Sequence, residues 1–408
     1  MFLRKKKYLT SGSLSKLALH RLLHNQLAVA SGIIILLAIL ISILGYLITP
    51  DSTPFANEQF LELSARKPGF DVTMLRVEKN ERHVRVGFLR KMLFGARRSY
   101  TSYPISEYHF EGPDILIREY SGVAGTMLPL KRFNLADVLY PLAPDQQVRS
   151  DGHDLVFKDI EGRWHSEPVV SMRDRVIHDM IRTKRFMLGT DRYGRDMLSE
   201  LMIGTRVSLS VGFISVFISL LIGLTLGSLA GFFKGRVDDV IVWFINVVWS
   251  IPTLLLVIAI TFALGKGFWQ VFIAVGLTMW VEVARVVRGQ ILSIREKEYV
   301  EAGRALGFSN LRLIVRHVLP NVMAPVIVIS AANFASAILI EAGLSFLGIG
   351  VQPPMPSWGT MIRDNYSYII LHSAYLAILP GVAIMIMVLA FMLTGNALRD
   401  AMDVKTIK

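Results

Sequence analysis

The sequence contains no cysteine and few charged residues for its length. Of 408 residues, 19% are charged and 52% are hydrophobic. The absence of cysteine excludes disulfide bonds, thiolate metal sites and a cysteine nucleophile. Soluble domains usually carry about a quarter charged residues. The shortage of charge therefore indicates long uncharged segments.

Six apolar runs account for this shortage. They cover residues 27–48, 207–233, 240–264, 268–284, 317–340 and 365–398. A helix needs roughly 20 apolar residues to cross a hydrocarbon core ~30 Å thick. Five runs exceed that length, whereas 268–284 is shorter and contains Glu282. Apolar core helices of soluble proteins are usually shorter, ~15 residues. We therefore predict an all-α polytopic membrane protein with six transmembrane helices, the first of them at 27–48.

The positive charge indicates which way the chain crosses the membrane. The formal net charge is +12, and Lys and Arg gather in the N-terminal segment 1–26, the turn at 234–236, residues 285–316 and the C-terminal end with the tail 401–408. The two short loops on the other side carry only Lys266 and Arg363. Positive segments beside a span tend to remain in the cytoplasm. We predict a cytoplasmic N-terminus that also contacts anionic membrane lipid, and no nucleic acid partner. Because run 27–48 is longer than the ~7–15 apolar residues of a signal peptide, we expect an uncleaved helix.

A hydrophilic region, residues 51–187, separates the first two spans. It contains strand-like stretches at 115–117 and 155–157, the second after the turn-forming pair 151–152. Its length is sufficient for a small domain. We predict a β-rich extracytoplasmic insert, with an irregular loop as the alternative. Its histidines show no metal-ligand spacing; they are His109, His153, His165 and His178.

Small residues in the second span predict a helix-packing seam. Gly223, Gly227 and Gly231 are spaced four apart and share one helix face. Glycine on such a face lets another helix backbone approach closely. The seam is expected either within the chain or with another subunit.

Polar residues in two later spans are candidates for a translocation path. They are Asn246, Ser250, Asn333 and Ser336. Polar groups at mid-span prefer a cavity or another helix to lipid, so a path and interhelical hydrogen bonding both remain open. Pro252, Pro325 and Pro380 predict kinks. Glu282 and Arg285 are three residues apart and are expected to form an ion pair.

The stretch 298–320 predicts a compact cytoplasmic knob. A short helix fits 298–306, with acidic residues in its first turn where they suit the helix dipole. Gly307 is placed to leave that helix in a left-handed conformation. Ser309 is placed to cap a second short helix that leads to Pro320. A helix of this length is not stable alone, so the knob is expected to pack against something.

This stretch resembles the EAA loop of bacterial ABC importer permeases, in which Glu-Ala-Ala is followed by a glycine and later by Leu-Pro. The matching residues are Glu301, Ala302, Gly307, Leu319 and Pro320. Gly303 departs from the usual alanine and is expected to loosen the helix by up to ~1 kcal/mol.

Two further segments resemble the C-type permease of the peptide/nickel (dipeptide and oligopeptide) branch. One is Gly-Thr-Asp-Arg-Tyr-Gly-Arg-Asp at 189–196, followed by Gly-Thr-Arg at 204–206. The other is Glu-Ala-Gly-Leu-Ser-Phe-Leu-Gly at 341–348, followed by prolines and Trp-Gly at 358–359. The resemblance covers about residues 16–50 and 186–400, with a permease core at 188–400. It does not cover most of the insert.

The resemblance implies a subunit of the bacterial cytoplasmic (inner) membrane that forms half of a pathway for peptides or related small solutes. The implied partners are a second homologous permease subunit, two cytoplasmic ATP-binding subunits and an extracytoplasmic substrate-binding protein. The chain has no phosphate-binding Gly-x-x-x-x-Gly-Lys-Ser/Thr loop, so we expect ATP hydrolysis on the partners and no cofactor here.

Two rival functions follow from other features. An intramembrane hydrolase would need a nucleophile, but Ser345 lacks the second glycine of Gly-x-Ser-x-Gly. The other rival is a membrane sensor or channel with an extracytoplasmic ligand-binding domain, against which the EAA-like loop argues.

Overall fold

The structure, a computed structural model, describes residues 14–82, 86–122, 128–143, 147–151, 153–265, 267–371 and 373–402. Lys266, the basic residues before position 14 and the tail 403–408, which contribute to the predicted orientation, lie outside these residues. The chain divides into two compact units. One comprises Met1–Ser42, Gly204–Arg363 and Ile378–Lys408, and the other Ile43–Ile203 and Asp364–Ala377.

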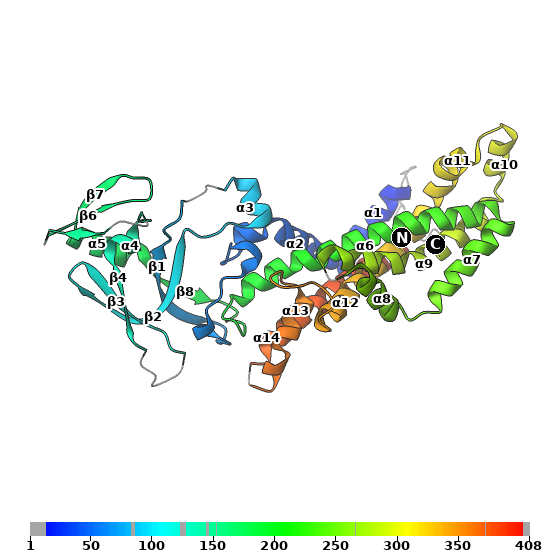
Figure 1. Cartoon of the computed structure of the whole chain (residues 1–408). Coiled ribbons are helices and arrows are strands. Elements are labelled where there is room, and N and C mark those ends of the chain that lie inside the picture. Colours follow the sequence, from blue (N-terminus) through cyan, green and yellow to red (C-terminus); the bar gives the residue numbers. More distant parts are fainter. Residues whose placement is uncertain are drawn as a thin grey trace, which may run out of the picture. The chain divides into compact units, whose positions relative to one another are not determined.

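The first unit is built from helices, shown in Figure 1. In chain order the helices are α1 (Leu14–His24), α2 (Gln26–Ile48), α6 (Met197–Phe233), α7 (Gly235–Trp249), α8 (Thr253–Leu264), α9 (Phe268–Ile294), α10 (Glu298–Ala305), α11 (Asn310–Arg312), the π-helical turn η4 (Leu313–Val318), α12 (Leu319–Phe346), α13 (Trp358–Asn365) and α14 (Tyr375–Met402). The ends of α2, α6, α13 and α14 reach into the second unit.

Five helices of the described residues are long and apolar enough to cross a membrane. They are α2, α6, α9, the continuous segment Asn310–Phe346 and α14. The run 240–264 is not one straight helix, because α7 and α8 meet at an angle of 93°. The break contains Pro252, which has no backbone N–H to continue the helix. Counting this bent pair as one span gives up to six.

The glycines of α6 face α9, and the two helices lie side by side (Figure 1). A β carbon on Gly223 would stand 2.6 Å from Cβ of Val283. On Gly227 it would stand 2.5 Å from the carbonyl oxygen of Ala284, and Gly231 meets the next turn of α9 in the same way. The absence of side chains at these positions lets the two backbones approach. The seam therefore lies within the chain.

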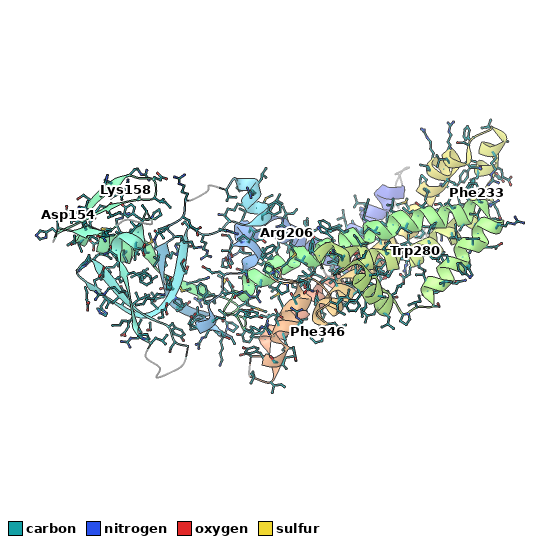
Figure 2. All side chains as sticks on the ribbon, viewed as in Figure 1. Asp154, Lys158, Arg206, Phe233, Trp280 and Phe346 are labelled. Atoms are coloured by element: carbon teal, nitrogen blue, oxygen red, sulfur yellow. The ribbon has the colours of Figure 1, made fainter. Side chains whose placement is uncertain are left out.

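α7 packs on α9 through an aromatic pair and an ion pair. The ring of Trp280, labelled in Figure 2, stacks on that of Phe244 with centroids 5.5 Å apart. Arg288 donates two hydrogen bonds to the carboxylate of Asp238, at 2.5 and 2.7 Å. The two-pronged geometry of the guanidinium fits a carboxylate, so this pair fixes the first turns of α7 against α9.

The second unit contains two antiparallel sheets. A five-stranded sheet has the order β4-β3-β2-β1-β8, and a three-stranded sheet has the order β5-β6-β7. The strands are β1 (Phe70–Glu78), β2 (Tyr100–Glu111), β3 (Asp114–Glu119), β4 (Leu130–Asn134), β5 (Arg149–Ser150), β6 (Asp154–Lys158), β7 (Trp164–Pro168) and β8 (Ile181–Phe186). The short helices are η1 (Pro54–Ala56), η2 (Leu61–Leu63), α3 (Phe88–Phe94), α4 (Leu135–Leu139), α5 (Val169–Arg175), η3 (Val176–Met180) and η5 (Tyr366–Ile369).

Both strands expected from the sequence are confirmed. Residues 115–117 lie in β3, and 155–157 lie in β6, whose ends Asp154 and Lys158 are labelled in Figure 2. Leu155 and Phe157 are fully buried in one core with the side chains of β3 and α4. At one edge of the sheet β8 pairs with β1, with Phe186 opposite Phe70. A folded β region therefore occupies the insert, and its location outside the membrane stays a prediction.

Candidate functional site

The helix expected at 298–306 is confirmed as α10, and its end is built as the sequence predicted. Gly307 adopts a φ of 76°, in the left-handed region that glycine enters without steric cost. Its N–H donates to the carbonyl of Arg304 at 2.9 Å, and the N–H of Phe308 donates to that of Gly303 at 3.0 Å. These two bonds form the Schellman arrangement that ends many helices.

The second helix of the loop is capped by Ser309, as expected, because its hydroxyl accepts a hydrogen bond from the N–H of Arg312. The prediction that this helix is short was wrong. It runs without a break through α11, η4 and α12 to Phe346. Leu319 and Pro320 begin α12, directly after the π-helical turn η4.

The loop is fixed to the long helices by an apolar core. Val300 of α10, with Leu313 and Val318 of η4, is buried in a cluster that includes Phe232 of α6 and the last turns of α9. Gly303 is buried against the same cluster: a β carbon there would stand 2.7 Å from Cδ2 of Leu313. The departure from alanine at Gly303 thus coincides with a close approach of the two halves of the loop.

The opposite side of the loop is exposed. The carboxylate of Glu301 pairs with no basic residue that the structure describes, and Ala302 beside it is also exposed. The same loop also exposes large apolar side chains, with exposed fractions of 73% for Leu306, 72% for Leu311, 56% for Val315 and 43% for Tyr299. An exposed apolar patch around a polar group is typical of a protein interface.

The four candidate path residues do not gather at one place. Ser336 lines a cavity of about 320 Å³ among α7, α8, α9 and α12, together with Glu282. Asn246 on α7 and Ser250, which follows that helix, are exposed and lie outside the lining of this cavity. Asn333 is buried, and no group in the described residues pairs with its amide nitrogen. The structure therefore supports only Ser336 as a lining residue of the cavity, and it adds Glu282.

The ion pair expected between Glu282 and Arg285 does not form. The guanidinium of Arg285 lies over the ring of Trp249 on α7, while the exposed Glu282 faces the cavity. A cation over an indole face gains an electrostatic attraction. The neighbouring helix thus offers Arg285 a contact that spacing along α9 does not reveal.

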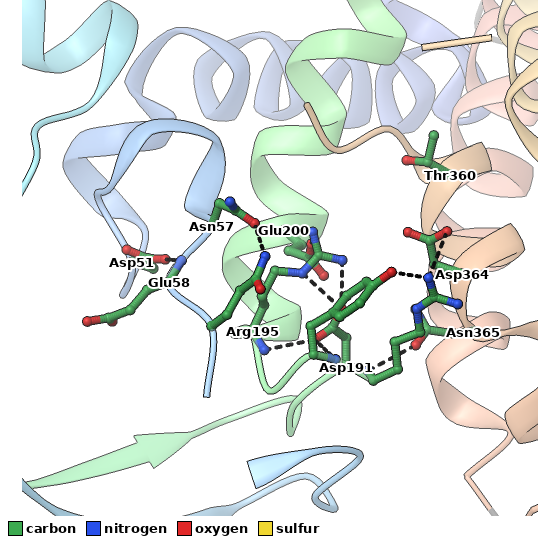
Figure 3. Close-up of polar contacts among 12 residues, drawn as sticks. Asp51, Asn57, Glu58, Asp191, Arg195, Glu200, Thr360, Asp364 and Asn365 are labelled. Carbon is green, nitrogen blue, oxygen red and sulfur yellow. Dashed lines mark hydrogen bonds and ion pairs between the residues drawn. The ribbon is translucent and has the colours of Figure 1, made fainter. Parts of the chain in front are cut away.

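The segment 189–196 forms a buried ion-pair loop at the start of α6 (Figure 3). The Asp191 carboxylate accepts the backbone N–H groups of Tyr193 and Arg195, at 2.9 and 2.8 Å, and the guanidinium of Arg195 at 2.7 Å. Arg195 also pairs with Glu200 of α6 at 2.8 Å. Burial lowers the pKa of Arg195, but the charges of Glu200 and Asp191 outweigh it and raise that pKa above its ordinary value. Sequence reasoning recognised this motif but not its ion pairs.

The segment 341–351 folds back on itself around a buried carboxylate. Glu341 is fully buried and accepts a hydrogen bond of 2.6 Å from the hydroxyl of Ser345. Ser345 in turn accepts the N–H of Val351 at 3.1 Å. A β carbon on Gly350 would stand 2.5 Å from the backbone nitrogen of Ser345. The hydroxyl of Ser345 is buried and takes part in both of these hydrogen bonds. The structure therefore does not support a nucleophilic role for this hydroxyl.

Two protein families match the chain. Residues 223–408 match the binding-protein-dependent transport system inner membrane component family. Residues 13–68 match the N-terminal transmembrane domain of oligopeptide transport permease C. Residues 69–222, which contain both β-sheets, lie outside the two matches.

Curated relatives match over about half of the chain. The di/tripeptide transport system permease protein DppC of Pseudomonas aeruginosa is 44% identical over 54% of this chain and 73% of its own. The glutathione transport system permease protein GsiD of Pectobacterium atrosepticum is 39% identical over 53% and 72%. The oligopeptide transport system permease protein OppC of Bacillus subtilis is 38% identical over 55% and 74%. This chain therefore belongs to the family of ABC importer permeases and is a C-type permease subunit, a multi-pass protein of the inner membrane.

Proposed function

We propose that this chain forms half of the translocation pathway of an importer for peptides or related small solutes. Its relatives are named for di/tripeptides, oligopeptides and glutathione, which share a peptide backbone. In this proposal a second homologous permease subunit completes the pathway, and an extracytoplasmic protein delivers the solute. The sensor or channel alternative is not favoured, because the relatives are transport permeases.

Two cytoplasmic ATP-binding subunits drive the transport, one of them docked on the 298–320 loop. The observation that carries this step is the exposed face of the loop, with Glu301 and an apolar rim, on a base held by Val300, Leu313 and Val318. A rigid loop transmits motion because its packed core moves as one body. The exposed carboxylate of Glu301 offers an acceptor to a basic group of the docked subunit.

The proposal includes six spans, with the bent α7–α8 pair counted as one. The N-terminus then lies in the cytoplasm, together with the 298–320 loop, and the insert 51–187 lies outside. Because the chain has no cysteine, single introduced cysteines report topology cleanly. Ser106→Cys on β2 should react with an impermeant maleimide in intact cells, and Ser309→Cys should react only after lysis. Labelling of Ser309→Cys from outside contradicts this topology.

Two substitutions test the docking of the ATP-binding subunits. Glu301→Lys reverses the exposed charge, and Gly307→Asp forces a side chain into the left-handed turn. We expect both variants to insert in the membrane but to lose ATP-binding subunits on purification, or to lose solute-stimulated ATP hydrolysis. Glu161→Lys is the matched control, since Glu161 is exposed in the second unit. Normal subunit recovery, stimulation and uptake in both loop variants would remove the coupling role from this loop.

A further inference from the structure

Five of the seven residues of the short helix α3 in the second unit are apolar, yet none of the seven is buried. Phe88, Leu89 and Phe94 have exposed fractions of 68%, 66% and 66%. Isolated exposed apolar residues are common, but a cluster of large ones marks a surface that is covered by something. The established activity does not account for this cluster, because it lies outside both family matches.

Backbone contacts hold α3 beside the end of a membrane span. The chain leaves α2 at Ile48, and a few residues later the carbonyl of Ser52 accepts the N–H of Ala96 at 3.0 Å. Gly95, which ends α3, lies so close to this segment that a β carbon would stand 2.7 Å from the same carbonyl oxygen. Figure 1 shows α3 beside the chain that follows α2. Because α2 spans the membrane, α3 lies at the level where that span meets the headgroups.

The surroundings of α3 are basic. Among the described residues that line a hollow of about 370 Å³ beside it, Glu81 is the only acidic one. The basic residues of that lining are Lys79, Arg82, Arg90, Arg97 and Arg98. Arg98 is paired with Asp51 and Glu58. By contrast, Arg90 and Arg97 are exposed, and neither pairs with an acidic group in the part of the chain that the structure describes.

Exposed aromatic and aliphatic residues beside exposed arginines have the composition of a helix that lies in a membrane interface. The apolar side chains enter the acyl boundary, and the cations contact lipid phosphates. The last turns of α2, a few residues before Ser52, also expose apolar side chains, with exposed fractions of 45% for Ile43 and 50% for Ile48. The contact of α3 with the segment that follows α2 and the positive charge favour lipid over a protein as the occupant.

We infer that α3 is an interfacial lipid-binding helix that anchors the β unit to the membrane surface and prefers anionic phospholipid. The inference depends on α2 being a span and not on the solute that the importer carries. It makes the insert a domain with its own contact to the bilayer, in addition to its chain connections to α2 and α6.

Cysteine-scanning fluorescence on the full chain tests this inference. Leu89→Cys on α3 is compared with Leu130→Cys on β4, a leucine that is also exposed. Each variant carries an environment-sensitive fluorophore in phosphatidylcholine vesicles, with or without phosphatidylglycerol. We expect brominated acyl chains to quench the label at position 89 and aqueous iodide to quench the label at position 130. Adding Arg90→Gln and Arg97→Gln should remove the extra quenching by brominated lipid that phosphatidylglycerol produces at position 89.

Equal iodide quenching at both positions in both kinds of vesicle would overturn the inference. So would shielding of position 89 that appears only when the second permease subunit or the substrate-binding protein is added, because this surface would then belong to a protein partner. Bromolipid quenching that is unchanged by phosphatidylglycerol and by the arginine substitutions would refute the preference for anionic lipid.

Discussion

Cδ2 of Leu313 lies 2.7 Å from the position that a β carbon on Gly303 would take. This contact joins α10 to η4, and the methyl group belongs to the end of a flexible side chain, so it is able to move slightly. Gly303→Ala gains up to ~1 kcal/mol of helix propensity against a small displacement of Leu313. We expect near-normal coupling for Gly303→Ala. Gly303→Val should displace Leu313 and lower ATPase stimulation. Full stimulation in Gly303→Val would show that this contact is unimportant.

Gly227 tests the seam between α6 and α9. A β carbon there would meet the backbone carbonyl of Ala284 at 2.5 Å, and a backbone atom does not move aside easily. Gly227→Ala should therefore destabilise the helix pair by about 1–3 kcal/mol. Gly289→Ala is the matched control, because nothing lies within 4 Å of its added carbon. Thermal unfolding in detergent measures the difference, and equal midpoints for the two variants would contradict the packing.

Arg195 links two buried carboxylates, those of Asp191 and Glu200. Arg195→Met removes the cation and leaves both acids without it, which typically costs about 3–5 kcal/mol. We expect low yield and early unfolding of this variant. Arg182→Met, at an exposed arginine of the second unit, should behave as the wild type. If Arg195→Met is as stable as that control, the loop does not depend on its ion pairs.

In the 298–320 loop, the sequence predicted the features that depend only on residues adjacent along the chain. Gly307 ends α10 because it adopts the left-handed conformation, and the hydroxyl of Ser309 caps the next helix. Pro252 predicted a kink between α7 and α8, but the sequence did not predict that it would reach 93°. The hydropathy of a run shows that its residues are apolar. It does not show how far the helix axis turns within the run.

Long-range contacts could not be predicted in the same way. Nothing near Phe70 in sequence indicates that its strand pairs with the one that ends at Phe186. The ion pair expected for Arg285 failed because Trp249, on another helix, offers a competing contact. The motif at 189–196 was recognised by resemblance. Its ion pair from Arg195 to Glu200 depends on how the loop folds onto α6.

Asp159 makes the stability of the β unit depend on pH. Its carboxylate bonds to the ring of His165 at 2.9 Å and to Arg163, and these bonds hold its pKa below its ordinary value of 3.8. The folded form therefore keeps this group ionised at pH values where the unfolded chain binds a proton. The resulting stability is present above pH 3.8 and is lost as pH falls toward the folded pKa.

A fragment of residues 55–188, which contains both sheets, is suitable for this measurement. Urea unfolding followed by circular dichroism should be cooperative, with a β-type spectrum, and its midpoint should fall with acid below pH 3.8. Asp159→Asn should lower the midpoint at neutral pH and flatten the acid dependence. A disordered spectrum would instead support the irregular-loop interpretation, and an unchanged acid slope in Asp159→Asn would assign the effect to other carboxylates.

Ser336 tests whether the cavity among α7, α8, α9 and α12 belongs to the path. Its side chain lines a space of about 320 Å³, so Ser336→Trp should fill much of it and reduce peptide uptake several-fold without loss of assembly. Ile327→Trp is the control, since Ile327 is exposed on the same helix and does not line the cavity. Uptake of labelled di- to oligopeptides by proteoliposomes of the whole complex measures both. Normal uptake by Ser336→Trp would place the path elsewhere.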